Sequence, residues 1–243
     1  MGTTHQYAFG ALQNLMLAAL PSEDIAPWQS RLEPVELARN QVLYSAGCAP
    51  EYVYFPTTAI VSLMRITCEG ASAEVAVVGN DGVVGISYLL GADSAATDAM
   101  VQSAGRAFRI SARFVKGEIA RSCGVMKVVL HYAQNVMAQM AQTAICNRYH
   151  SIEQQFCRHL LLRLDRLPGD ELNMTHELAA NLLGVRREGI TVSAHKLQEK
   201  GLIRYSLGHI EVLDREGLEE KACECYAIAK KEYRRLLPVR LAA

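Results

Sequence analysis

The chain has 243 residues and equal numbers of basic and acidic side chains, 25 Lys+Arg against 25 Asp+Glu. Half of the residues are hydrophobic and 21% are charged, a composition that excludes a disordered, collagen-like or disulfide-scaffold protein. The charge is uneven along the chain: residues 1–147 hold 9 Lys+Arg and 11 Asp+Glu, whereas residues 148–243 hold 16 and 14. The basic excess therefore lies in the C-terminal part.

The seven cysteines stand at irregular spacings and include no C-x-x-C pair, a pattern that favours a reducing compartment over a disulfide framework. The apolar stretch over residues 12–20 contains Gln13 and Asn14 and no Lys or Arg, which argues against a signal peptide. No segment reaches the run of about 18 apolar residues that a membrane span needs. We therefore expect a cytoplasmic protein with no membrane partner.

The first half of the chain has the pattern of short helices followed by short strands. Helices are predicted over Ala11–Leu20 and Glu23–Arg31. Turn residues then divide the chain at nearly regular intervals, which is typical of an all-β sandwich or barrel. The predicted strands are Gln41–Tyr44, Tyr52–Phe55, Ile60–Ile66, Ala73–Val78, Met100–Ser103 and Ala107–Ile110.

The pattern becomes helical from Ala112. A short helix over Arg113–Arg121 precedes a long one, from about Val125 to Tyr149, that contains no Gly or Pro and would span about 36 Å. Its apolar residues recur at spacings of three and four. They form either a core face packed on the sheet or, as we favour, a coiled-coil face in a homodimer. This predicted interface comprises Met126, Val129, Ala133, Val136, Met137, Met140 and Ala144.

The segment from Met174 to Leu213 has the pattern of a winged helix, after a helix over Ser151–Leu167. Thr175 is a suitable cap for a helix over His176–Leu183, and Gly184 suits the turn that ends it. A second helix is predicted over Arg187–Lys200, which completes a helix-turn-helix. Two alternating segments around Leu207-Gly208 then predict a hairpin wing.

The same segment carries a local positive charge. Residues 184–209 contain five Lys+Arg and two Glu, which is the footprint that phosphate binding requires. Double-stranded DNA is therefore the expected partner. The alternative is a winged helix that contacts another protein.

Several stretches resemble the Crp/Fnr superfamily of transcription regulators. Met174–Ile203 (MTHELAANLLGVRREGITVSAHKLQEKGLI) resembles its DNA-binding signature. Val42–Gly47 (VLYSAG), Val53–Pro56 (VYFP) and Val78–Gly91 (VGNDGVVGISYLLG) resemble its sensor domain. The resemblance implies an α+β fold: a β-roll sensor over residues 1–122, a dimerisation helix over 123–149 and a winged helix-turn-helix over 150–243.

The resemblance also implies which side chains read bases. The Arg-Glu pair of the family falls on Arg187 and Glu188, and these types suit guanine and cytosine respectively. Arg186 stands where the family usually has Ser, and Val192 where many members have a second Arg. We expect Arg186 to join the base-reading set and Thr191 and Val192 to contact a thymine methyl group.

The remaining expected contacts are to the DNA backbone. Gly189, which follows the base-reading pair, is expected to let the helix backbone approach DNA closely. The side chains expected to position the phosphates are Thr175, His195, Lys196, Lys200, Arg204 and His209.

The residues by which family members hold a cyclic nucleotide are replaced in this chain. Val83 stands near the place of the ribose-binding Glu, and Thr97-Asp98 near that of the phosphate-binding Arg. No Lys or Arg occurs from Ile66 through Gly105, so a buried phosphate would have no cation. We therefore expect no cyclic nucleotide, and the effector, if the roll takes one, is not identified.

The sequence gives little support for an iron–sulfur cluster or another metal site. Residues 1–47 contain no cysteine, which argues against the N-terminal iron–sulfur cluster of the oxygen-sensing relatives. Cys223 and Cys225 fall in a predicted helix over Arg215–Leu237, where residues two apart point about 200° away from each other, so the two thiols cannot share one metal unless that helix is broken. We therefore predict no metal site and no cofactor. A haem ligand among the histidines stays open.

The sequence contains no Walker loop, G-x-G-x-x-G, G-x-S-x-G or H-E-x-x-H motif, and we expect no enzyme. The prediction is a homodimeric transcription regulator that reads a near-palindromic DNA site with the helix around residues 187–200. RNA polymerase is a candidate further partner. The alternative is a ligand or redox sensor whose winged helix contacts protein.

Overall fold

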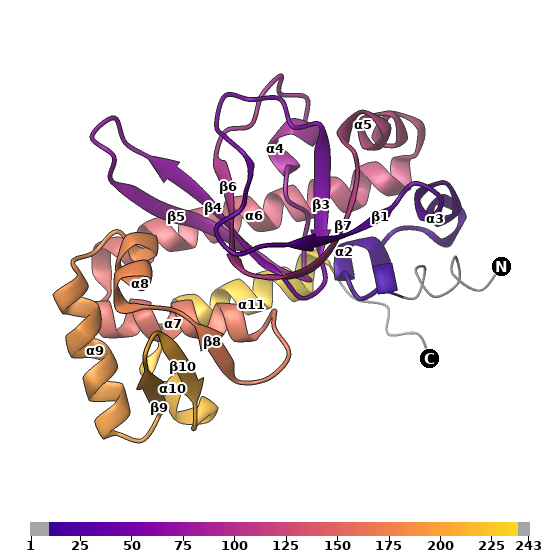
Figure 1. The fold of residues 1–243 in the computed structure, drawn as a ribbon. Coiled ribbons are helices and arrows are strands. Elements are labelled where there is room, and N and C mark those ends of the chain that lie inside the picture. The colour runs from indigo at the N-terminus through magenta and orange to yellow at the C-terminus, as the bar shows by residue number, and fades with distance from the viewer. Residues whose placement is uncertain (1–9, 238–243) are drawn as a thin grey trace.

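The structure is a computed structural model that describes residues 10–237 (Figure 1). Its N-terminal part, here called the roll, is built from two antiparallel sheets. One sheet has the strand order β1 (Glu33–Leu37), β7 (Gly105–Ser111) and β3 (Tyr52–Pro56). The other has the order β2 (Val42–Tyr44), β6 (Asp98–Ser103), β4 (Ile60–Ile66) and β5 (Ser72–Val78).

Apolar side chains from both sheets meet inside the roll. Val53 and Phe55 of β3 are buried, as are Val61 of β4 and Val101 of β6. Short helices cover this core: α2 (Leu15–Ala18), α3 (Ser22–Gln29), α4 (Ile86–Leu89) and α5 (Ala112–Arg121). Trp28 of α3 packs edge-on against Phe55, with ring centroids 6.1 Å apart.

Helix α6 (Cys123–Tyr149) has one buried and one exposed apolar face. The residues predicted for the dimer interface come from both faces. Val129, Ala133 and Val136 are buried in the core of the roll, so their assignment to a dimer interface is wrong. These three side chains belong to the alternative that was left open, a core face packed on the sheets. A separate exposed stripe, here called the outer face of α6, consists of Met126, Leu130, Met137, Ala141, Ala144 and Ile145.

The C-terminal part, residues 152–237, is here called the reader. It begins with α7 (Ile152–Leu164), which Ser151 and Gln154 close with a capping box. Helices α8 (His176–Leu183) and α9 (Arg187–Glu199) then pack beside a sheet of order β8-β10-β9. Its strands are β8 (Glu171–Asn173), β10 (His209–Val212) and β9 (Ile203–Ser206). The α+β class, with a β-rich N-terminal part and a C-terminal helix-turn-helix, is confirmed.

The C-terminal helix expected over Arg215–Leu237 is broken in two. Helix α10 (Arg215–Lys221) ends before Ala222 and Cys223, which have extended backbone angles, and α11 (Glu224–Leu236) begins after them. The break places Leu218 in the core of the reader while Leu237 packs into the core of the roll. Neither Gly nor Pro stands at Ala222 and Cys223, so the sequence carries no local signal for this break.

The reader and the roll share buried surface. Ile60, Met64 and Val77 of the roll lie in the same apolar cluster as Phe156 and Leu160 of α7. Helix α11 returns across the reader beside α6 (Figure 1), and the Tyr233 hydroxyl donates to the Asp81 carbonyl at 3.1 Å. No helix within residues 10–237 is long and apolar enough to cross a membrane.

Candidate nucleic-acid interface

The turn between α8 and α9 sets the direction of the second helix. The Thr175 hydroxyl accepts from the Leu178 amide at 3.1 Å and so caps α8. Gly184 ends α8 with φ 66°, a left-handed conformation that glycine adopts without steric cost. Ile190 and Leu197 then bury the inner face of α9 in the core of the reader.

The opposite face of α9 is exposed and contains every residue expected to read bases. Because residues four apart share a helical face, Arg187, Thr191 and His195 line one row. Glu188 and Val192 line the adjacent row, and Val192 is 54% exposed although it is apolar. The positive end of the helix lies at the start of this face, where it favours an anion.

The Thr191 hydroxyl is already engaged within the reader. It donates to the Arg187 carbonyl at 3.1 Å and lies 3.1 Å from His176 Nδ1. The His176 ring stacks on Tyr205 of the wing, with centroids 4.0 Å apart. Burial, and secondarily the charge of Arg187, lower the pKa of His176, so its ring is neutral at pH 7. The His176–Tyr205 stack has no local signal in the sequence, because it joins α8 to β9, two elements that only folding brings together.

Most of the cations expected at the DNA backbone lie beside carboxylates. Lys196 and Lys200 both face Glu153 of α7, at 3.9 and 3.2 Å. Arg204 forms a further ion pair with Glu211, and the rings of His209 and His195 lie 3.5 and 3.4 Å from the carboxylates of Glu171 and Glu199. The charge count over residues 184–209 omitted Glu153, Glu171 and Glu211 because they lie outside that segment.

Arg186 and Arg187 differ from these cations. Neither has a carboxylate within 4.0 Å among residues 10–237. Both are exposed, and Arg186 is the N-cap residue of α9 without a side-chain cap bond. Their positive charge is therefore available to a ligand at the entrance of the exposed face.

The wing places an apolar side chain at its tip. Leu207 and Gly208 both have positive φ, 49° and 82°, as a tight hairpin between β9 and β10 requires. The Leu207 side chain is fully exposed. The wing, formed by β9 and β10, lies beside α9 (Figure 1).

Gly189 has a different role from the one expected. A Cβ added there would meet Ile152 Cδ1 of α7 at 2.6 Å. Gly189 thus faces the Ile152 side chain of α7 and not the exposed face of α9, so the expectation of a DNA-facing glycine is wrong.

Apolar side chains fill the roll around Val83, the residue that the resemblance places near the ribose-binding Glu. Val83 and Val84 are fully buried, and Tyr44 projects among them. Burial raises the pKa of Tyr44. Thr97, near the place that the resemblance gives to the phosphate-binding Arg, is itself buried.

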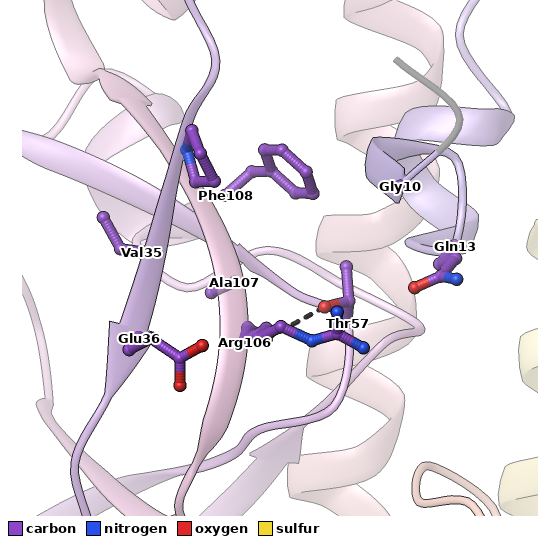
Figure 2. A pocket seen from close by; sticks show the side chains of 9 residues that line it. Gly10, Gln13, Val35, Glu36, Thr57, Arg106, Ala107 and Phe108 are labelled. Atoms are coloured by element: carbon purple, nitrogen blue, oxygen red, sulfur yellow. Dashed lines mark hydrogen bonds between the residues drawn. The ribbon is translucent and has the colours of Figure 1, made fainter. Parts of the chain in front are cut away.

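A separate pocket of about 390 Å³ lies between the N-terminal segment and the edge of the roll (Figure 2). Gly10 and Gln13 form one wall, and β1 and β7 form the other (Figure 2). Glu36 and Arg106 stand opposite each other in the strand register, so acid and base balance there. The lining therefore carries no net positive charge that would attract an anion.

The break between α10 and α11 changes the position of the last two cysteines. Cys223 is the N-cap residue of α11 and Cys225 lies in its first turn. The prediction that their thiols point apart assumed an unbroken helix, and it is wrong. Both thiols instead lie close to Cys146 and His150 at the end of α6.

Two family models match the chain. Residues 34–122 match the cyclic nucleotide-binding domain, and residues 156–221 match the Crp-like helix-turn-helix domain. No curated protein matches the sequence.

Several solved structures share the fold at low sequence identity. FixK2 from Bradyrhizobium japonicum has 15% identity and a TM-score of 0.66, covering 79% of this chain and 98% of its own. A CRP/FNR-family transcriptional regulator from Thermus thermophilus has 22% identity and a TM-score of 0.63, covering 78% and 98%. The c-di-GMP-responsive regulator CLP from Xanthomonas campestris has 14% identity and a TM-score of 0.61, covering 79% and 99%.

Proposed function

Because the chain is a transcription regulator of the Crp/Fnr type, we propose that it binds a near-palindromic DNA site as a homodimer. Residues 123–149 would dimerise and residues 150–243 would bind DNA. The observation that carries this proposal is the exposed face of α9, which begins with two arginines that have no carboxylate partner in the described chain. Such a face suits the major groove, which is about 12 Å wide.

Arg187 is the proposed guanine reader, because its guanidinium can donate two hydrogen bonds to O6 and N7. Glu188 on the adjacent row accepts from the cytosine amino group. Val192, one turn further, meets a thymine methyl group. Thr191 presents only its methyl group to the base, since its hydroxyl already donates to the Arg187 carbonyl. Arg186, at the entrance of the helix, contacts a base edge or the neighbouring phosphate.

The paired cations serve the phosphates in this proposal. Exposed ion pairs such as Lys200–Glu153 and Arg204–Glu211 stabilise a protein little, about 0–1 kcal/mol, so a phosphate can replace the carboxylate at small cost. Lys196, His195 and His209 stand in similar exposed pairs. Thr175 contributes through the N-terminus of α8.

The outer face of α6 is the proposed dimer contact. Its side chains are apolar and exposed, with Leu130 at 51% and Met137 at 62%. Leu130, Met137 and Ala144 recur every seven residues, the repeat that pairs two helices in a coiled coil. To read half-sites one turn of DNA apart, such a dimer has to place its two copies of α9 about 34–36 Å apart.

We propose no cyclic nucleotide ligand for the roll, since Tyr44 and Val83 occupy its interior and no lysine or arginine lies between Ile66 and Gly105. We also propose no catalytic role. RNA polymerase stays a candidate partner of the DNA-bound dimer.

The proposal is tested by selecting bound sequences from a random DNA pool and titrating the preferred site by fluorescence anisotropy. Arg187→Ala should weaken binding to that site by about 5- to 150-fold and relax the preference at one position of each half-site. Arg39→Ala removes an exposed cation from the roll and serves as the matched control. Equal affinities of the two variants would refute the readout role.

The salt dependence separates DNA binding from the rival function. Counterion release makes the logarithm of the DNA association constant fall steeply with the logarithm of salt. A protein-contacting sensor would instead show no sequence-selective DNA binding at any salt concentration. That outcome would overturn the proposed function.

A further inference from the structure

Four metal-ligating side chains converge where the end of α6 meets the start of α11. Cys146 and His150 come from the last turn of α6 and its C-cap, four residues apart and therefore on one face. Cys223 and Cys225 come from the N-cap and first turn of α11. Their donor atoms all lie within 4.8 Å of one another.

The separations suit a tetrahedral metal centre. Zinc bound at about 2.3 Å to sulfur and 2.0 Å to nitrogen holds its ligand atoms roughly 3.5–3.8 Å apart. Cys146 Sγ lies 3.5 Å from Cys223 Sγ, and Cys225 Sγ lies 3.4 Å from His150 Nδ1. The sulfur–sulfur distance is far from the covalent distance of about 2.05 Å in a disulfide.

The surroundings orient these groups as a metal site requires. His150 Nε2 lies 3.2 Å from the Glu224 carboxylate, which can hold the proton on Nε2 and leave the Nδ1 lone pair directed at the thiols. The Gln142 amide donates to Cys225 Sγ at 3.0 Å. An imidazole aimed among three thiols and an amide donor to sulfur are polar features that a purely apolar cysteine cluster does not need.

The start of α11 adds a favourable field at the site. The thiols of Cys223 and Cys225 lie at the positive end of this helix. Three thiolates with one Zn²⁺ carry one negative charge, which the helix end partly offsets.

We propose that Cys146, His150, Cys223 and Cys225 bind one structural zinc ion. All three cysteines are buried, with exposed fractions of 0%, 4% and 0% in chain order, so the four protein ligands close the site. Three thiolates and one imidazole select zinc over magnesium or calcium, which prefer oxygen ligands. The ion would tie the end of α6 to α11, the helix that runs back from the reader to the roll.

Zinc content of the full-length protein is the direct test. After growth with added zinc and purification without chelator, we expect about one zinc per protomer by mass spectrometry of the metal. Cys146→Ser and Cys223→Ser should each lose it. Cys157→Ser, a buried cysteine of α7 outside the cluster, is the matched control and should retain it.

Two further measurements avoid the cysteine variants, which would be uninformative if they failed to fold. The wild-type protein, stripped of metal and shown to be folded by circular dichroism, should take up Co²⁺ with a thiolate charge-transfer band that added zinc abolishes. Glu224→Gln should weaken zinc binding by about 10- to 100-fold, whereas Glu220→Gln, an exposed glutamate nearby in sequence, should not.

Three results would overturn the proposal. The first is a folded, stripped protein that binds neither zinc nor cobalt. The second is a Cys146–Cys223 disulfide in protein alkylated at lysis. The third is iron with sulfide in the purified protein in place of zinc. Because none of the four ligands belongs to the residues proposed to contact DNA, each of these results is distinct from failure of DNA binding.

Discussion

Arg163 of α7 and Glu74 of β5 form an ion pair of 2.5 Å that joins the reader to the roll, with side chains that are 1% and 9% exposed. The same guanidinium lies 3.0 Å from His159 Nδ1, and Glu74 also accepts from the Ser62 hydroxyl. A second buried pair, Arg166 with Asp81 at 2.6 Å, lies one turn further along the chain. These contacts set the orientation of the reader, so their loss should affect both stability and DNA binding.

Replacing Glu74 should destabilise the protein strongly. Glu74→Gln removes the charge that compensates the buried Arg163, and breaking such a pair costs about 3–5 kcal/mol. Urea unfolding measures the change. Glu33→Gln removes the partner of Arg109 in an exposed pair and should cost at most about 1 kcal/mol. Similar losses in the two variants would contradict the structural role of the buried pair.

Stability should fall below about pH 6.5 because of His159. Burial first, and then the charges of Arg163 and Arg158, lower the pKa of His159 well below 6.5. The unfolded chain therefore binds a proton that the folded protein does not, so this contribution is present above the unfolded pKa and is lost as the pH decreases.

The measurement compares unfolding free energies at pH 7.5 and 5.5. The wild type should lose about 1 kcal/mol more than His159→Gln over this interval. His195→Gln, which changes an exposed histidine, should keep the full pH dependence. A wild type and a His159→Gln variant with the same pH dependence would refute the assignment.

Two glycine substitutions should have opposite effects. A Cβ at Gly82 would collide with the hydroxyl oxygen of the buried Tyr132, so Gly82→Ala should destabilise by about 1–3 kcal/mol or more. Gly117, inside α5, has open space around it, and Gly117→Ala should stabilise by about 1 kcal/mol. Thermal unfolding checks both, and a stabilised Gly82→Ala would show that Tyr132 does not pack as described.

A charge on the outer face of α6 should prevent dimer formation. Met137→Glu places two like charges near the proposed two-fold axis, and sedimentation should then show monomers. Leu90→Glu changes an apolar residue of similar exposure outside α6 and should leave the dimer intact. A dimeric Met137→Glu protein would exclude this face as the contact.

Local sequence patterns predicted the elements whose signals are short in range. Thr175 and Gly184 mark the two ends of α8 by chemistry that a few neighbouring residues determine, and the helix-turn-helix and the roll followed from such signals. Strands β1 and β8 were missed, because β1 contains Pro34 and is largely exposed, and β8 has only three residues. Both strands form by pairing with distant strands rather than by a pattern of their own.

The sequence by itself therefore determined the type of protein: a β-rich N-terminal part, a long helix and an α9 whose exposed face carries Arg187 and Glu188. Only the tertiary structure decided which face of α6 is buried, which cations of the reader meet Glu153, and how Cys223 and Cys225 reach Cys146. Helical spacing sorts residues onto faces, but it does not say what lies against each face. The break before α11 falls at Ala222 and Cys223, where no Gly or Pro interrupts the helical pattern, so it left no local signal in the sequence.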